Sequence, residues 1–187
     1  MRSEAEQIEY FTEEDYYALP DDRRAELIDG ILYDMASPSI SHQAISSEIF
    51  IEITSHIRKN GGKCRVFYAP CDVKLFPEED GNIVQPDLLV VCDPDKIHPN
   101  RLEGAPDLIV EIVSPGNPAH DYVRKLDLYD RAGVREYWIV DPMRKKTMVY
   151  ALEKDSFSMN DYGFDETVPS QIFQGMSIDF KAISERI

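Results

Sequence analysis

The sequence contains no long apolar run, since its uninterrupted apolar stretches extend over only a few residues in a chain of 187. A helix that crosses a membrane needs about 20 consecutive apolar residues, so we expect no transmembrane segment. The opening residues Met1-Arg2-Ser3-Glu4 also lack the apolar core of a secretory signal. We therefore expect a cytoplasmic protein with no membrane partner.

Cysteine is scarce: the chain has only Cys64, Cys71 and Cys92, and no C-x-x-C pair. These spacings are not typical of a zinc site. In a cytoplasmic protein we expect reduced thiols. A structural pairing of Cys64 with Cys71 is the alternative.

Positively charged residues are also few, because the chain has 20 Lys and Arg compared with 35 Asp and Glu, which gives a net charge of −15. Proteins that bind nucleic acid usually present a basic surface, because neutralising phosphates supplies much of the affinity. The basic residues gather in two stretches, which could form a basic face or be ordinary solvated surface. They are Arg124, Lys125, Arg131, Arg135, Arg144, Lys145 and Lys146 in one stretch, and Arg58, Lys59, Lys63 and Arg65 in the other.

Several motifs of common enzyme classes are missing. The chain has no P-loop and no G-x-G-x-x-G, and Ser114 lacks the G-x-S-x-G setting of a serine hydrolase. It has no repeat, linker or low-complexity segment either. Its length and its 43% apolar residues suit one globular domain over residues 1–187.

What is present is a mixture of helix and strand patterns. We expect a short helix capped by Thr12, a hairpin over 25–35 that turns at Asp29-Gly30, a helix from Ser39 or Ser41 to Lys59, and a helix over about 119–132. The expected strands are 64–69, 72–76, 86–92, 107–113, 136–140 and 147–152, with one or two more after residue 156. Residues 93–106 are polar and Pro-rich, which favours a surface excursion. The pattern predicts a mixed α/β (α+β) fold.

Glu111 is the most informative residue, because it lies within the apolar run Leu108-Ile109-Val110-Glu111-Ile112-Val113. Such a run is typical of a strand that is buried on both faces. An unpaired carboxylate there costs several kcal/mol, so Glu111 needs a cation, a metal or a proton. A buried ion pair or a solvent-facing edge position is the structural alternative to a functional role.

Asp87 opens a second apolar run, Leu88-Leu89-Val90-Val91. If the two strands are neighbours, Asp87 and Glu111 can converge on one hard divalent cation. Mg²⁺ prefers oxygen ligands and needs only one or two protein carboxylates. Alone, Asp87 would be an ordinary aspartate at a strand end.

Lys125 can supply a cation near these carboxylates. In the helix that follows the Glu111 strand, Asp121, Lys125 and Tyr129 share one face at i, i+4 and i+8. A right-handed crossover returns this helix over the sheet, where the face could meet Glu111. A surface salt bridge between Asp121 and Lys125 is the alternative.

Together these segments resemble the PD-(D/E)xK nuclease superfamily and, within it, a bacterial family of Uma-type restriction endonucleases. The resemblance covers about residues 10–150. It is carried by Glu26-Leu27-Ile28-Asp29-Gly30, Pro86-Asp87-Leu88, Asp107-Leu108-Ile109-Val110-Glu111-Ile112-Val113-Ser114-Pro115, Asp121 to Lys125, and Gly133-Val134-Arg135-Glu136-Tyr137-Trp138-Ile139-Val140-Asp141-Pro142.

The resemblance implies a restriction-endonuclease-like fold, with a mixed central sheet, flanking helices, an N-terminal helix and a β-hairpin. It implies that Asp87, Glu111 and the main-chain carbonyl of Ile112 bind Mg²⁺ or Mn²⁺, and that Glu26 is a further acidic member of the site. The superfamily places a lysine two residues after the glutamate, but this sequence has Val113 there. Related families carry that lysine on the next helix, where Lys125 matches.

Other residues are weaker candidates. His42 lies near the start of the long helix and could line the same cleft, although a histidine at a helix end is often structural. Asp121 and Tyr129 are expected at the rim of the site. His56, His98 and His120 show no metal-ligand spacing, and Trp138 is expected in the core.

The sequence therefore predicts an endonuclease that hydrolyses phosphodiester bonds in nucleic acid, with DNA favoured, and a homodimer because cutting two strands needs two sites. Two alternatives stay open. One is a nuclease-fold interaction domain without catalytic activity, which the net charge of −15 favours. The other is a metal-dependent hydrolase of a different phosphoester.

Overall fold

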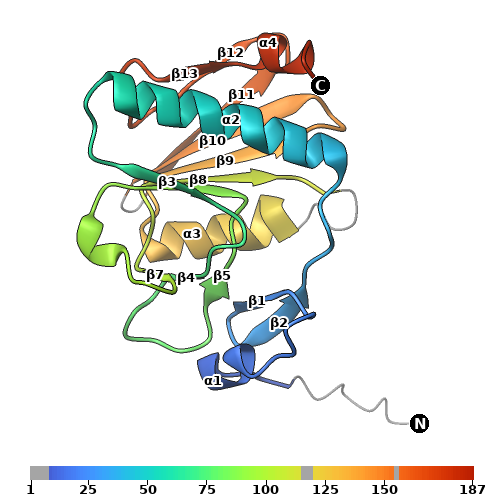
Figure 1. The fold of residues 1–187 in the computed structure, drawn as a ribbon, viewed down its shortest axis with the longest axis vertical. Coiled ribbons are helices and arrows are strands. Elements are labelled where there is room, and N and C mark those ends of the chain that lie inside the picture. The colour runs from blue at the N-terminus through green and yellow to red at the C-terminus, as the bar shows by residue number, and fades with distance from the viewer. Residues whose placement is uncertain (1–8, 115–119, 154–155) are drawn as a thin grey trace.

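The computed structural model describes residues 9–114, 120–153 and 156–187, without the side chains of residues 120, 121 and 153. Its centre is a six-stranded sheet in the order β11-β10-β9-β8-β6-β3 (Figure 1). These strands are β3 (Arg65–Tyr68), β6 (Leu88–Val91), β8 (Leu108–Ile112), β9 (Glu136–Asp141), β10 (Lys146–Glu153) and β11 (Ser156–Gly163). β8 and β9 pair in parallel, whereas the other neighbours in this sheet are antiparallel.

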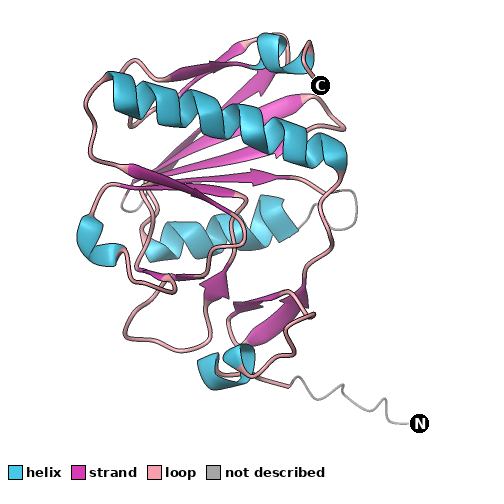
Figure 2. Ribbon diagram, in the orientation of Figure 1, coloured by secondary structure: helices cyan, strands magenta, loops and turns pink. Residues whose placement is uncertain are grey.

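Two helical segments cover the two faces of this sheet (Figure 2). α2 (Ile40–Lys59) lies on one face and buries Ile45, Ile49, Ile53 and Ile57, the stripe that recurs every fourth residue. α3 (Leu126–Ala132) lies on the other face and buries Leu128 and Tyr129. Both faces of the central strands β6, β8 and β9 are therefore buried.

The central strands distribute their side chains between these two layers by simple alternation. Leu108, Val110 and Ile112 of β8 pack in the cluster that contains the isoleucines of α2. Ile109 and Val113 pack in the cluster that contains Leu128 and Tyr129. Each fully buried aliphatic side chain stabilises the fold by roughly 2 kcal/mol. The same alternation directs Glu111 to the α3 side.

A second, smaller sheet has the order β2-β1-β5-β4-β7 and lies below the central sheet in Figure 1. Its strands are β1 (Ala25–Ile28), β2 (Ile31–Asp34), β4 (Val73–Lys74), β5 (Ile83–Val84) and β7 (Leu102–Glu103). Asp29 and Gly30 both have positive φ, at 49° and 75°, as the expected tight hairpin turn requires. The two-residue strands β5 and β7 were not predicted, because they are too short to show a pattern.

The remaining elements lie at the edges. They are α1 (Glu13–Tyr17), the 3-10 helix η1 (Pro94–Lys96), β12 (Thr167–Pro169), β13 (Ser177–Asp179) and α4 (Phe180–Ser184). Thr12 and Asp15 form a capping box at α1, and Ser39 caps α2. No helix among the described residues is both long enough and apolar enough to cross a membrane.

The helix expected over about 119–132 is not a continuous α-helix. His120–Lys125 forms a π-helix, η2, and α3 continues from Leu126 to Ala132. Gly133 ends α3 with φ 85°, a left-handed conformation that favours glycine. Wide turns of this kind often occur at functional sites, and this one ends at Lys125.

The expectation of reduced thiols was wrong for two of the three cysteines. Cys64 and Cys92 form a disulfide, and Cys71, the alternative partner of Cys64, is free and half-buried. The strand register explains the pairing. Arg65 lies opposite Val91 in the antiparallel β3–β6 pair, so the next positions outward, Cys64 and Cys92, face each other. The sequence could not reveal this register.

Candidate active site

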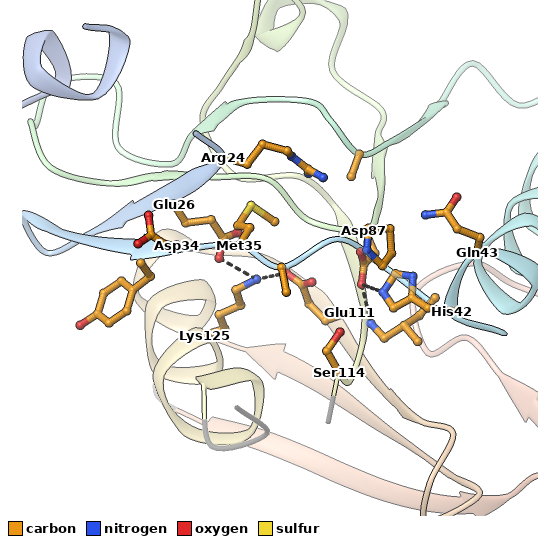
Figure 3. Close-up of a pocket in the computed structure, with 15 residues that line it drawn as sticks. Arg24, Glu26, Asp34, Met35, His42, Gln43, Asp87, Glu111, Ser114 and Lys125 are labelled. Carbon is orange, nitrogen blue, oxygen red and sulfur yellow. Dashed lines mark hydrogen bonds and ion pairs between the residues drawn. The ribbon is translucent and has the colours of Figure 1, made fainter. Parts of the chain in front are cut away.

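A pocket of about 340 Å³ lies where the smaller sheet, the start of α2 and the end of η2 meet the central sheet (Figure 3). Its walls include the carboxylates of Glu26, Asp87 and Glu111 and the cations of Arg24 and Lys125. These residues come from segments that are far apart in the sequence. The pocket therefore brings together Glu26, Asp87, Glu111 and Lys125, which were proposed for one site from the sequence.

Glu111 is almost completely buried, with 4% of the residue exposed, in the middle of the parallel β8–β9 pair. Because alternation turns it towards α3, it meets Lys125 and Tyr129. The Lys125 Nζ donates to Glu111 Oε1 over 2.8 Å, and the Tyr129 hydroxyl donates to the same oxygen over 2.7 Å. The carboxylate that looked isolated in the sequence is thus paired in the fold.

Glu26 lies on β1, in the smaller sheet, and is equally buried. Its Oε2 is 3.0 Å from Lys125 Nζ, and its Oε1 accepts a hydrogen bond of 2.9 Å from the backbone N–H of Gln85. Lys125 therefore lies between two buried carboxylates. Removing ions from water costs several kcal/mol each, so the two buried carboxylates depend on the Lys125 ammonium to offset that cost.

Tyr129 was expected at the rim of the site, but it lies in the core and contacts the site through Glu111. It is fully buried. Burial raises its pKa well above 10.0, and the charges of Glu111 and Glu26 raise it further. The phenol consequently keeps its proton and remains a hydrogen-bond donor to Glu111.

Asp87 lies immediately before β6, beside the end of β8. Its Oδ2 accepts a hydrogen bond of 2.8 Å from the backbone N–H of Ile112 and lies 3.0 Å from His42 Nε2. Because a carboxylate oxygen accepts, the ring nitrogen is the donor. Within the described residues Oδ1 makes no hydrogen bond, so one oxygen of Asp87 is left for a ligand.

His42 is placed in the site by the start of α2. The Ser39 hydroxyl oxygen accepts a hydrogen bond from the backbone N–H of His42, which fixes the first turn of the helix. The imidazole is buried against Asp87, and its Nδ1 has no hydrogen-bond partner in the described part of the chain. His42 therefore lies in the pocket and orients Asp87.

Comparison with known proteins identifies the family. A family model named Uma2, described as "Putative restriction endonuclease", matches residues 13–181. The chain belongs to the Uma2 family. The resemblance seen in the sequence is thereby confirmed.

Two further proteins are similar to this chain. A crystal structure described as a putative nuclease belonging to DUF820, from Anabaena variabilis, shares the fold with a TM-score of 0.75 and 22% identity, covering 94% of this chain and 98% of that one. An uncharacterized protein, slr1290 from Synechocystis sp., is 28% identical over 141 residues, which cover 74% of this chain and 67% of the relative. The restriction-endonuclease-like fold class expected from the sequence matches the solved structure.

The donor atoms of this Uma2 site fit a hard divalent cation better than zinc. Among the described residues, no three His, Cys, Asp or Glu side chains are grouped to hold a metal. The site instead offers Asp87 and Glu111, with Ile112 also lining the pocket. Mg²⁺ keeps several waters and needs only one or two carboxylates, so this oxygen set suits it.

Not every expected feature of the site is present. The side chain of Asp121, predicted at the rim, lies outside the described residues. The basic stretch does not form a bare basic face, because three of its arginines are paired with acids. The pairs are Arg131 with Asp29 and Asp127, Arg135 with Asp107, and Arg144 with Asp141.

Two residues were missed in the sequence: Arg24, which lines the pocket, and Gln85, which contacts Arg24 and Glu26. Arg24 lies two positions before Glu26, and in an extended strand i and i+2 share a face. That alternation could have placed both side chains in the same pocket. Gln85 directly precedes Pro86-Asp87, but its role depends on contacts with β1 that no local pattern records.

Proposed function

We propose that the protein is a metal-dependent endonuclease that hydrolyses phosphodiester bonds in nucleic acid, with DNA favoured over RNA. One observation carries the proposal above all. The Lys125 Nζ lies 2.8 Å from Glu111 Oε1, although lysine is missing from its usual position at Val113. This contact supports the assignment of the missing lysine's role to Lys125, from the following helical segment.

Asp87, Glu111 and the main-chain carbonyl of Ile112 would hold Mg²⁺ or Mn²⁺. When bound, such an ion lowers the pKa of a water and stabilises negative charge on phosphoryl oxygens. The role of Lys125 is to orient the attacking water and to stabilise charge on the phosphate as it is attacked. Glu26 and Tyr129 keep the Lys125 ammonium and the Glu111 carboxylate in position, and His42 does the same for Asp87.

The proposal extends to the partners of the protein. With a net charge of −15, binding to nucleic acid cannot rest on general attraction. It has to come from local contacts in and around the pocket. A homodimer would supply the two sites that cutting both strands of a duplex requires.

Cleavage assays test the proposal directly. Purified protein is incubated with supercoiled plasmid, linear duplex, single-stranded DNA and RNA, each with Mg²⁺, Mn²⁺ or EDTA. We expect metal-dependent cleavage that Asp87→Ala abolishes and the exposed control Asp165→Ala preserves. Cleavage that survives Asp87→Ala unchanged would refute the assignment of the site.

A second candidate is a domain that retains the nuclease fold but cleaves no nucleic acid. The pairing of Arg131, Arg135 and Arg144 with acids favours it, because these side chains are engaged within the protein. The same assay separates the two candidates. Binding of Mn²⁺ without cleavage of any nucleic acid or of bis(p-nitrophenyl) phosphate supports the silent domain, whereas cleavage of the small diester alone supports another phosphoesterase.

A further inference from the structure

Arg24 is a cation of the pocket that the proposed chemistry does not use. It directly precedes β1, and Figure 3 shows its side chain extending from the strand of Glu26 across the pocket towards Asp87. Its Nη2 donates to Gln85 Oε1 over 3.1 Å. Its Nε is buried and has no hydrogen-bond partner among the described residues. A guanidinium has five donor hydrogens, so most of its hydrogen-bonding capacity remains unused.

The other cations near Arg24 form ion pairs with carboxylates, whereas Arg24 does not. Arg23 forms an ion pair with Asp34 over 2.8 Å, and Lys125 lies between Glu26 and Glu111. Arg24 forms no ion pair within the described part of the chain, although several carboxylates line the same pocket. Its charge is therefore not neutralised by a contact inside the protein.

Arg24 is nevertheless held in a defined position. Gln85 Nε2 donates to Asp72 Oδ1 over 2.9 Å and to the Tyr16 hydroxyl over 3.1 Å. The Tyr16 hydroxyl in turn donates to Asp72 Oδ1 over 3.0 Å. These bonds fix the amide of Gln85 so that its Oε1 faces Arg24. A cation that is oriented by a network and left without an anion is prepared for an anionic ligand.

We propose that Arg24 is the phosphate-binding residue of the pocket and contacts the non-bridging oxygens of a backbone phosphate in a nucleic-acid strand. The planar guanidinium matches the geometry of two phosphate oxygens, which an ammonium does not. The nucleic-acid strand thereby meets a second cation of the pocket, in addition to Lys125. This inference rests on the proposed function, since it assumes that the ligand is nucleic acid.

The salt dependence of binding tests this contact. The probe is a short fluorescent oligothymidylate, measured by anisotropy in Ca²⁺ over a range of salt concentrations. On a single strand, each phosphate contact contributes about 0.7 to the slope of log affinity against log salt. Arg24→Ala is expected to reduce the slope by about 0.7 and the affinity by about tenfold at low salt.

Two further variants separate binding from charge and from folding. Arg135→Ala removes the same charge from an exposed side chain outside the pocket, and it should keep the wild-type slope. Arg24→Gln is neutral but can still donate to Gln85. Its salt slope should fall by the same amount as that of Arg24→Ala. Thermal unfolding of each variant identifies any that fails to fold.

The outcomes distinguish this inference from the proposed function. A wild-type slope in Arg24→Gln, or no binding of the oligothymidylate by the wild type, overturns the role of Arg24. Binding with the expected slope change but without cleavage supports Arg24 and removes the nuclease proposal. Cleavage by the wild type together with a wild-type slope in Arg24→Gln supports the nuclease proposal and removes the role of Arg24.

Discussion

The Lys125 Nζ lies 3.0 Å from Glu26 Oε2, and this contact joins the end of η2 to β1 of the smaller sheet. The same ammonium contacts Glu111 on the central sheet. One buried lysine thus links three segments of the fold at the floor of the pocket. The site therefore depends on the packing of the two sheets as much as on any single motif.

Replacing Lys125 with methionine should damage stability and activity together. The variant leaves Glu26 and Glu111 buried without their cation, which costs about 3–5 kcal/mol of unfolding free energy. Urea denaturation measures this loss, and nucleic-acid cleavage should fall below detection. In the double variant Glu26→Gln/Lys125→Met part of the stability should return while cleavage stays absent. Equal stability of the single variant and the wild type would contradict the buried triad.

Replacing Tyr129 with phenylalanine tests the hydroxyl that donates to Glu111. Loss of a buried donor to a charged acceptor should cost about 1–3 kcal/mol. In the wild type, the pKa of Tyr129 is raised well above 10.0 by burial, so alkaline loss of its proton should not limit cleavage up to pH 10. A fall in activity below pH 10 that Tyr129→Phe removes would contradict this assignment.

Replacing His42 with alanine should weaken metal binding without unfolding the protein. The imidazole holds Asp87 Oδ2, and loss of a partner that orients a metal ligand commonly reduces affinity by about tenfold or more. Titration with Mn²⁺ measures the change. His56→Ala, on the same helix but outside the pocket, is the matched control. An unchanged affinity in His42→Ala would show that the imidazole does not orient the ligand.

The replacement Asp141→Asn tests the contact that Tyr122 of η2 makes with β9. Asp141 Oδ2 accepts from the Tyr122 hydroxyl over 2.8 Å and from Arg144 Nη1 over 3.1 Å. Burial alone raises the pKa of Asp141, but its hydrogen bonds with Arg144 and Tyr122 hold that pKa below its usual range. Burial, followed by the bond to Asp141, raises the pKa of Tyr122 to about 12, so the phenol remains a donor.

A lowered pKa in the fold means that the charge of Asp141 stabilises the protein above the unfolded value of about 3.9. This contribution is lost as the pH falls through the lower value in the fold. The wild type should therefore lose more stability than Asp141→Asn between pH 5 and pH 3, as measured by urea unfolding. At pH 7 the variant should be about 1–2 kcal/mol less stable. Parallel acid profiles of the two proteins would argue against the contribution of this carboxylate.

The features that were predictable from the sequence have local causes. The alternating burial of Leu108 to Val113 follows from an apolar run, and the hairpin turn follows from Asp29-Gly30. Glu111 stood out because a carboxylate in such a run has to be explained. Lys125 was then found as the cation that the next helix could supply, and the structure brings the two together.

The features that were missed depend on register and on contacts between sheets. Cys64 faces Cys92 only because β3 and β6 pair in one register. Arg24 reaches the pocket because Gln85 from another segment holds its guanidinium. The burial of Tyr129 beneath Glu111 follows from how closely α3 packs on the sheet. Among these relationships, only the place of Arg24 has a periodic signal in the sequence, which is its i, i+2 spacing from Glu26.

The hydrogen bond from the backbone N–H of Gln85 to Glu26 Oε1 has a consequence for folding. It crosses between the segment that presents Asp87 and the strand that carries Glu26, and the acceptor is a buried side chain. The amide hydrogen can exchange with solvent only when this contact opens. Its exchange rate therefore reports whether the pocket opens locally or only when the whole domain unfolds.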